Sequence, residues 1–221
     1  RLIEEANNPE EIHGGGSAMV DLSRLYLLDA ENPNYRVGPD GTLEAKAAQE
    51  GITPVELFLN ETDRSDGSVM LSLPILNQDY EAIETMLQDE SIVMGLADAG
   101  AHVGQIMDSS QPTYFLSHWV RDTGFFSLEE GVRRITSDTA DLFGLVDRGR
   151  IVEGGYADIN IIDFDQLALT GPEYVHDFPG GSGRYVQRGV GYDATIVNGQ
   201  VFMEHGEHTG ALAGVTLRST D

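Results

Sequence analysis

The stretch from residue 92 to residue 104 brings a carboxylate and an imidazole close together in the sequence. An apolar run from Ile92 to Leu96 predicts a buried strand, and Asp98 and His102 follow it among alanine and glycine residues. In α/β architectures the carboxyl end of a strand is the edge where ligands and reactive groups lie. A carboxylate there can bind a metal ion and accept a proton from an attacking water molecule. The small neighbouring residues leave room for a substrate.

A structural role for Asp98 is also open. An Asp side chain often accepts a hydrogen bond from the backbone two residues further on, and so caps a turn. The six histidines form neither His-x-His nor His-Glu-x-x-His, the spacings that place two metal ligands on one face. They lie at positions 13, 102, 118, 176, 205 and 208. The chain therefore contains no recognisable complete metal site, and Asp98 is either a functional group or a turn cap.

The charge balance excludes some classes of partner. Acidic residues number 37 against 13 basic ones, which gives a formal net charge of −24. Such a surface repels nucleic acids and anionic membranes, so neither is an expected partner. There are no cysteines, which excludes a disulfide framework and a thiolate metal site and favours a cytoplasmic location.

The elements that position Asp98 are predicted as helix-and-strand units before residue 146. Thr53 and Glu56 form a capping box, with Pro54 at the first helical position. Helices are predicted over 42–50, 53–60, 77–88 and 113–120, the third of them capped by Asn77. Strands are predicted over 23–28 and 69–73.

Two further helical segments are predicted before the boundary. Ser127 and Glu130 form a second capping box, and Leu128, Val132 and Ile135 share one face, which predicts burial of that face. A last short helix is predicted through Phe143, with Ser137 as its cap and Gly144 at its end.

Beyond the boundary near residue 146 the pattern favours antiparallel strands. Asn198-Gly199 separates two runs, 192–197 and 200–204, that are rich in strand-forming residues, and this dipeptide is a strong hairpin signal. A strand is also predicted over 157–164. The stretch 165–191 is rich in glycine and proline and is predicted to be a linking loop.

The residues from Gly95 to Gly104 resemble the last barrel strand of the amidohydrolase superfamily, in the branch of the D-aminoacylases (N-acyl-D-amino-acid deacylases). The resemblance covers residues 36–214 in order. Its other segments are Ser117–Arg121, Arg134–Ser137, Leu145–Gly149, Gly154–Asp163, Val197–Val201 and Gly206–Ala211.

The resemblance implies a fold of the α/β plus β class. Residues 1–146 would form the closing part of a TIM-like (β/α) barrel, and residues 147–221 would supply strands of a small β-sandwich domain. It also implies zinc-dependent, or other divalent-metal-dependent, hydrolysis of the amide C–N bond of an N-acyl-D-amino acid. Asp98 matches the aspartate that binds the metal and acts as general base, and His102 is the expected substrate contact.

The chain also departs from the family pattern. The histidines that earlier barrel strands supply as metal ligands have no counterpart, and a complete barrel takes about 250 residues. The sequence is therefore expected to be an incomplete fragment, inactive alone, whose partner is the missing N-terminal part of a longer enzyme. A homo-oligomer is possible. The alternatives are a cyclic amide or ureide hydrolase of the same superfamily, or a non-catalytic binding or assembly module.

Overall fold

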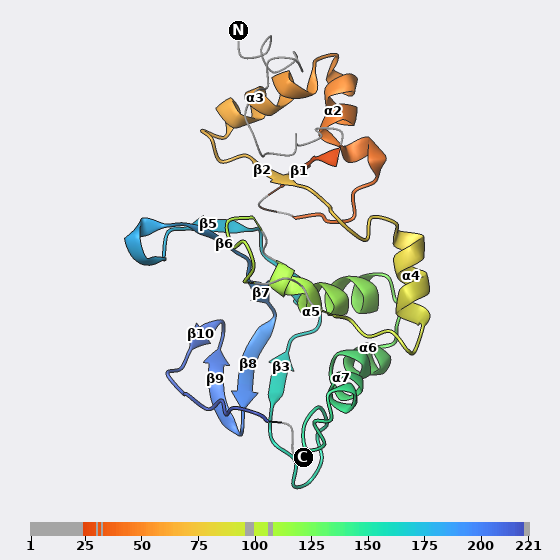
Figure 1. Cartoon of the computed structure of the whole chain (residues 1–221), viewed down its shortest axis with the longest axis vertical. Coiled ribbons are helices and arrows are strands. Elements are labelled where there is room, and N and C mark those ends of the chain that lie inside the picture. The colour runs from red at the N-terminus through yellow and green to blue at the C-terminus, as the bar shows by residue number, and fades with distance from the viewer. Residues whose placement is uncertain (1–23, 30, 32, 96–99, 106–107, 219–221) are drawn as a thin grey trace. The chain divides into compact units, whose positions relative to one another are not determined.

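The computed structural model describes residues 24–29, 31, 33–95, 100–105 and 108–218, and the chain divides into two compact units, residues 1–84 and 85–221. Figure 1 shows its helices and strands. The strand pairs in the described ranges are all antiparallel, and these ranges contain no closed barrel. No helix in the same ranges is long and apolar enough to cross a membrane.

The first unit packs two helices against a pair of short antiparallel strands that are far apart in the sequence. Strand β1 (Tyr26–Leu28) pairs with β2 (Met70–Ser72), and helices α2 (Leu43–Glu50) and α3 (Pro54–Arg64) follow the 3-10 turn η2 (Pro39–Gly41). Both strands and both helices were predicted, although α3 extends beyond residue 60. The buried core of this unit consists of Leu25, Leu43, Ala47 and Leu57.

Local caps set the ends of these helices, as the sequence predicts. The Thr53 hydroxyl accepts a hydrogen bond from the Glu56 amide at 3.2 Å, and the Glu56 carboxylate accepts one from the Thr53 amide at 2.8 Å. The pKa of Glu56 lies below its ordinary value, chiefly because of the bond from the Thr53 amide. Gly51 ends α2 in the left-handed conformation, at a φ of 72°, which glycine adopts without steric cost.

Helix α4 (Tyr80–Gln88) begins later than predicted and has a different cap. Asp79, not Asn77, accepts hydrogen bonds from the amides of Glu81 and Ala82, at 3.0 and 3.2 Å. After the helix, Asp89 Oδ1 accepts bonds from the hydroxyl and the amide of Ser91, at 2.6 and 2.8 Å. These bonds lower the pKa of Asp89, the hydroxyl contributing most. They form the turn that leads into residue 92.

The core of the second unit is organised around a π-helix. Helix α5 (Gln111–Tyr114) follows the turn η3 (Asp108–Ser110) and continues into the π-helical segment η4 (Phe115–Asp122). Its buried apolar residues lie four positions apart in two pairs, so they share one face of the segment. The segment buries Phe115, Leu116, Trp119 and Val120.

Helix α6 (Leu128–Ile135) corrects one prediction from the sequence. Ser127 caps it as predicted, with the Glu130 amide donating to its hydroxyl at 3.2 Å. However, Leu128 and Val132 are 45% and 40% exposed, so the predicted apolar face is not buried. The helix instead turns the buried Gly131 toward η4, where a Cβ atom would overlap the side chain of Val120. Helix α7 (Ser137–Leu142) follows; Ser137 does not cap it as predicted but is its first residue, and its hydroxyl donates back to the Arg133 carbonyl at 3.4 Å.

The second unit also contains a four-stranded antiparallel sheet in the order β10-β9-β8-β3. The predicted hairpin is confirmed, with Asn198 and Gly199 at φ values of 48° and 78°, as a type I′ turn requires. The strands are β3 (Ile159–Ile162), β8 (Tyr192–Val197), β9 (Gln200–Glu204) and β10 (Glu207–His208). Strand β3 is shorter than the predicted 157–164.

The predicted linking loop at 165–191 instead holds two small pairs of strands. Short strands separated by glycine-rich turns carry too little alternation to be recognised from the sequence. Strand β4 (Ala168–Leu169) pairs with β7 (Gly189–Val190), and β5 (Glu173–Val175) pairs with β6 (Arg184–Val186). The turn η5 (Pro179–Gly181) lies between β5 and β6.

An arginine ties the turn at 147–149 to the four-stranded sheet. The Arg148 side chain is only 10% exposed; its guanidinium pairs with Asp158 and donates to Asn198 Oδ1 at 2.9 Å. Asn198 completes the arrangement, because its backbone N–H donates to Asp158 Oδ1 at 2.8 Å. The guanidinium also lies 4.3 Å from the ring centroid of Tyr156. We call these four residues the Arg148 cluster.

We predict that Arg148→Met lowers the free energy of unfolding by about 1–2 kcal/mol, because Asn198 Oδ1 and the partly exposed carboxylate of Asp158 lose hydrogen bonds to a charged group. Arg148→Lys should recover only part of the loss, since lysine lacks the planar fork. Urea unfolding gives the measurement. Arg150→Met, which breaks the exposed pair with Asp141, is the matched control and should cost much less; an equal loss in both variants would contradict the prediction.

We also predict that Ser91→Ala raises the pKa of Asp89 part of the way back to its ordinary value, because the hydroxyl bond is lost and the amide bond stays. A depressed folded-state pKa means that these bonds stabilise the fold above about pH 3.9. That contribution disappears as the pH falls through the folded value. Carboxyl-carbon NMR titration measures the shift. Asp141, whose pKa is lowered by Arg150, should not move in the same spectra.

Candidate functional site

The segment that leads toward Asp98 does not form the predicted strand. Residues 92–95 are irregular, Ile92 and Gly95 are exposed, and Val93 and Met94 are half-buried. A strand needs at least one neighbouring strand to form the ladder of backbone hydrogen bonds. None of the strands in the described ranges pairs with this segment, which accounts for the difference. Asp98 itself lies outside the described residues, so its role stays a prediction.

His102 is described, and it lies on an exposed turn. Its backbone adopts a φ of 45°, in the left-handed region that is uncommon for residues other than glycine. The Gln105 amide donates to the His102 carbonyl at 2.7 Å and closes the turn. The imidazole is exposed and therefore accessible to a substrate. Strained backbone of this kind is often found at functional positions, which makes the turn a candidate part of the site.

The residue after His102 is bonded to a strand far away in the sequence. The Tyr185 amide in β6 donates to the Val103 carbonyl at 2.9 Å, so the turn lies against the β5–β6 hairpin. In Figure 1 the chain after residue 100 runs beside β6. This hairpin carries Tyr174 and His176, which sequence reasoning did not connect with the site. The only available signal was the alternation of aromatic residues within a glycine-rich stretch.

The described residues do not fit a complete metal site. No group of three or more His, Cys, Asp or Glu side chains in the described ranges lies close enough to hold a metal ion. His118 is half-buried and packs against two aromatic side chains: its ring stacks on Tyr114 at 4.9 Å and meets Trp119 edge-on at 5.1 Å. A metal site would therefore need ligands from outside these ranges.

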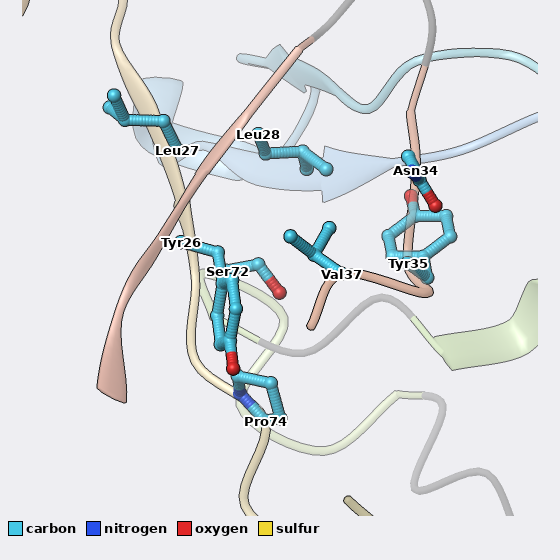
Figure 2. Close-up of a pocket in the computed structure, with 8 residues that line it drawn as sticks. All are labelled: Tyr26, Leu27, Leu28, Asn34, Tyr35, Val37, Ser72 and Pro74. Carbon is cyan, nitrogen blue, oxygen red and sulfur yellow. The ribbon is translucent and has the colours of Figure 1, made fainter. Parts of the chain in front are cut away.

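Two small pockets are too narrow to hold an acylated amino acid. The pocket in Figure 2 lies in the first unit, beside β1, and measures about 20 Å³. Its lining residues are Tyr26, Leu27, Leu28, Asn34, Tyr35, Val37, Ser72 and Pro74. A second pocket of about 20 Å³ lies in the second unit and includes Ile92, Val93 and Arg134. Each has room for about one water molecule, whereas ligand sites occupy several hundred Å³.

Comparison with known proteins gives related sequences and a related fold. An uncharacterized protein of Mycobacterium tuberculosis is 28% identical over 173 residues, which are 72% of this chain and 28% of that protein. A D-aminoacylase of Alcaligenes xylosoxydans xylosoxydans is 33% identical over 105 residues, which are 48% of this chain and 20% of the enzyme. The chain thus spans less than a third of the length of either relative.

The solved structure of a D-aminoacylase mutant in complex with copper chloride matches 89% of this chain and 38% of its own length. The TM-score is 0.50 and the identity 22%. This likeness shows a common fold. The sequence similarity to a D-aminoacylase, together with this common fold, confirms the predicted resemblance to the D-aminoacylase-like branch. The model of the amidohydrolase family matches residues 39–203, and because this range is most of the chain, the protein belongs to the amidohydrolase family.

Proposed function

We propose that this chain forms part of the active site of an enzyme that hydrolyses an amide C–N bond, with N-acyl-D-amino acids as substrates. The observation that carries the proposal is the family match over residues 39–203, a range that includes Asp98 and His102. Similarity to a D-aminoacylase and to an N-acyl-D-glutamate deacylase, at 33% and 40% identity over shorter stretches, supports the substrate class.

In the proposed reaction Asp98 is the general base. Its carboxylate takes a proton from water as the water oxygen attacks the acyl carbon of the substrate. The C–N bond then breaks, and Asp98 passes the proton to the departing nitrogen. The products are a carboxylic acid and a free amino acid. The alanines and glycines that neighbour Asp98 in the sequence have small side chains or none, which favours access of a substrate to the carboxylate on this proposal.

We also propose that Asp98 is a ligand of a divalent metal ion, most simply zinc. The support is the match to a D-aminoacylase structure in complex with copper chloride. The described residues do not supply the rest of such a ligand set, so the proposal assigns the other ligands to residues outside the described ranges. On this proposal the remaining part of the enzyme is the partner that completes the active site.

His102 is proposed to contact the substrate. The imidazole is exposed and is carried on a turn that the bond between Tyr185 and Val103 holds against β6. A ring nitrogen can donate a hydrogen bond to the substrate carboxylate or to the amide oxygen. The left-handed backbone at this position fixes the direction in which the side chain leaves the turn.

We predict that Asp98→Ala, in the full-length protein, lowers kcat for hydrolysis of N-acetyl-D-amino acids at least about a hundredfold, because a positioned general base contributes that much or more. Release of the free amino acid gives the rate. Asp165→Ala, which removes an exposed aspartate from a turn in the second unit, is the control and should keep kcat. An undiminished kcat in the Asp98 variant would disprove the assignment.

For His102 we predict that Ala and Gly substitutions both raise KM about tenfold, because either one removes a hydrogen bond to a charged group. The two variants should differ in stability, since alanine keeps the strain of a positive φ and glycine relieves it. Steady-state kinetics and urea unfolding measure the two effects. A normal KM in the glycine variant alone would show that the backbone conformation, not the imidazole, is what matters.

A further inference from the structure

The β5–β6 hairpin presents an aromatic face next to the turn that carries His102. In the strand register Tyr174 lies opposite Tyr185. The amide of Tyr185 is directed to Val103 and not across to β5, so the two tyrosines form a pair whose side chains lie close together on one face. Their ring centroids are 4.9 Å apart, with the rings at 71° to each other. His176 belongs to the same face, with its ring 5.3 Å from that of Tyr174.

This face is both exposed and fixed in position. Tyr174 is 47% exposed although its ring contacts Tyr185 and His176. The ring lies directly over Gly183, where a Cβ atom would overlap it. An aromatic side chain that is held in place and still accessible can bind an apolar group with little loss of conformational entropy.

The arginine of the hairpin is already paired with an aspartate of the same hairpin. Arg184 donates to both carboxylate oxygens of Asp177, at 2.9 and 2.6 Å, and its guanidinium lies 5.4 Å from the Phe178 ring centroid. The bond from Arg184 lowers the pKa of Asp177. His176 Nδ1 lies 3.0 Å from the Gly181 carbonyl oxygen. Because Arg184 is the only arginine in residues 173–186, the hairpin offers an apolar group a better fit than it offers a carboxylate.

We propose that the β5–β6 hairpin forms one wall of the substrate site and that Tyr174 sets the preference for the acyl group of an N-acyl-D-amino acid. This inference rests on the proposed function and adds a specificity residue to it. The hydrogen bond from Tyr185 to Val103 makes the hairpin continuous with the His102 turn. The ring of Tyr174 contacts the apolar part of the acyl group, and larger acyl groups gain more from that contact.

The test compares N-phenylacetyl-D-leucine with N-acetyl-D-leucine in the full-length protein. Tyr174→Ala should lower the ratio of kcat/KM for phenylacetyl over acetyl about tenfold, mostly through KM, as expected for a lost apolar contact. Tyr174→Phe should keep the ratio. Gly183→Ala, which displaces the ring without removing it, should lower the ratio as well, and it serves as the test if the alanine variant at 174 does not fold. Phe143→Ala, which removes an exposed aromatic side chain beside α7, is the matched control and should leave the ratio unchanged.

Equilibrium binding of both compounds, measured by calorimetry, separates this inference from the proposed function. If hydrolysis continues and the ratio is unchanged in Tyr174→Ala and Gly183→Ala, the inference is overturned and the proposed function stands. If the wild-type protein hydrolyses neither compound, the proposed function fails, and the binding measurements then test the hairpin inference by themselves. A tenfold weaker binding of the phenylacetyl compound in Tyr174→Ala would then support the hairpin as a binding wall, and unchanged or absent binding would overturn it.

Discussion

The positive charge of a guanidinium that is removed from water must be compensated by hydrogen bonds or a negative charge. In the second unit this requirement, at Arg148, links three separate segments of the chain. Its partners Asp158 and Asn198 stand beside β3 and in the β8–β9 turn, and Asn198 Nδ2 also donates to the Ala213 carbonyl at 2.5 Å. A charge buried in this way costs several kcal/mol unless its hydrogen bonds are made with good geometry. The turn at 147–149 and the sheet therefore form their contacts together or leave the charge uncompensated, and the segment near 213 is joined to them through Asn198.

The same cluster shows which parts of the fold the sequence predicts. Asn198-Gly199 predicts the β8–β9 hairpin because a type I′ turn needs two consecutive residues with positive φ, and few dipeptides supply them. The capping box of Thr53 and Glu56 is predicted for a similar reason, since each side chain bonds the backbone of the other. In both cases all the interacting groups lie within a few residues, so that the local sequence contains the whole interaction.

The predictions that were wrong depended on partners from elsewhere in the chain. Residues 92–96 have the composition of a buried strand, but a segment becomes a strand only if another strand pairs with it. No strand in the described ranges pairs with residues 92–95. Leu128 and Val132 have helical spacing and remain exposed. Helix α6 turns another face toward η4, the one that carries Gly131, because glycine has no Cβ atom to collide with Val120. The spacing of apolar residues along a helix indicates which face is apolar, but it does not indicate which other element covers that face.

The candidate site combines both kinds of information. Asp98 is predicted from its immediate neighbours, because the small residues around this carboxylate form a short motif, and both its role and its contacts stay a prediction. The hairpin beside His102 could not be recognised in that way, since the bond from Tyr185 to Val103 joins segments far apart in the sequence. If the proposed function holds, Asp98 is the reactive group and belongs to the family motif, whereas substrate preference depends on the separate β5–β6 hairpin. Because the Arg184–Asp177 pair and the backbone bond from Tyr185 to Val103 do not involve the side chain of Tyr174, that side chain can change without disturbing the residues proposed to carry out the hydrolysis.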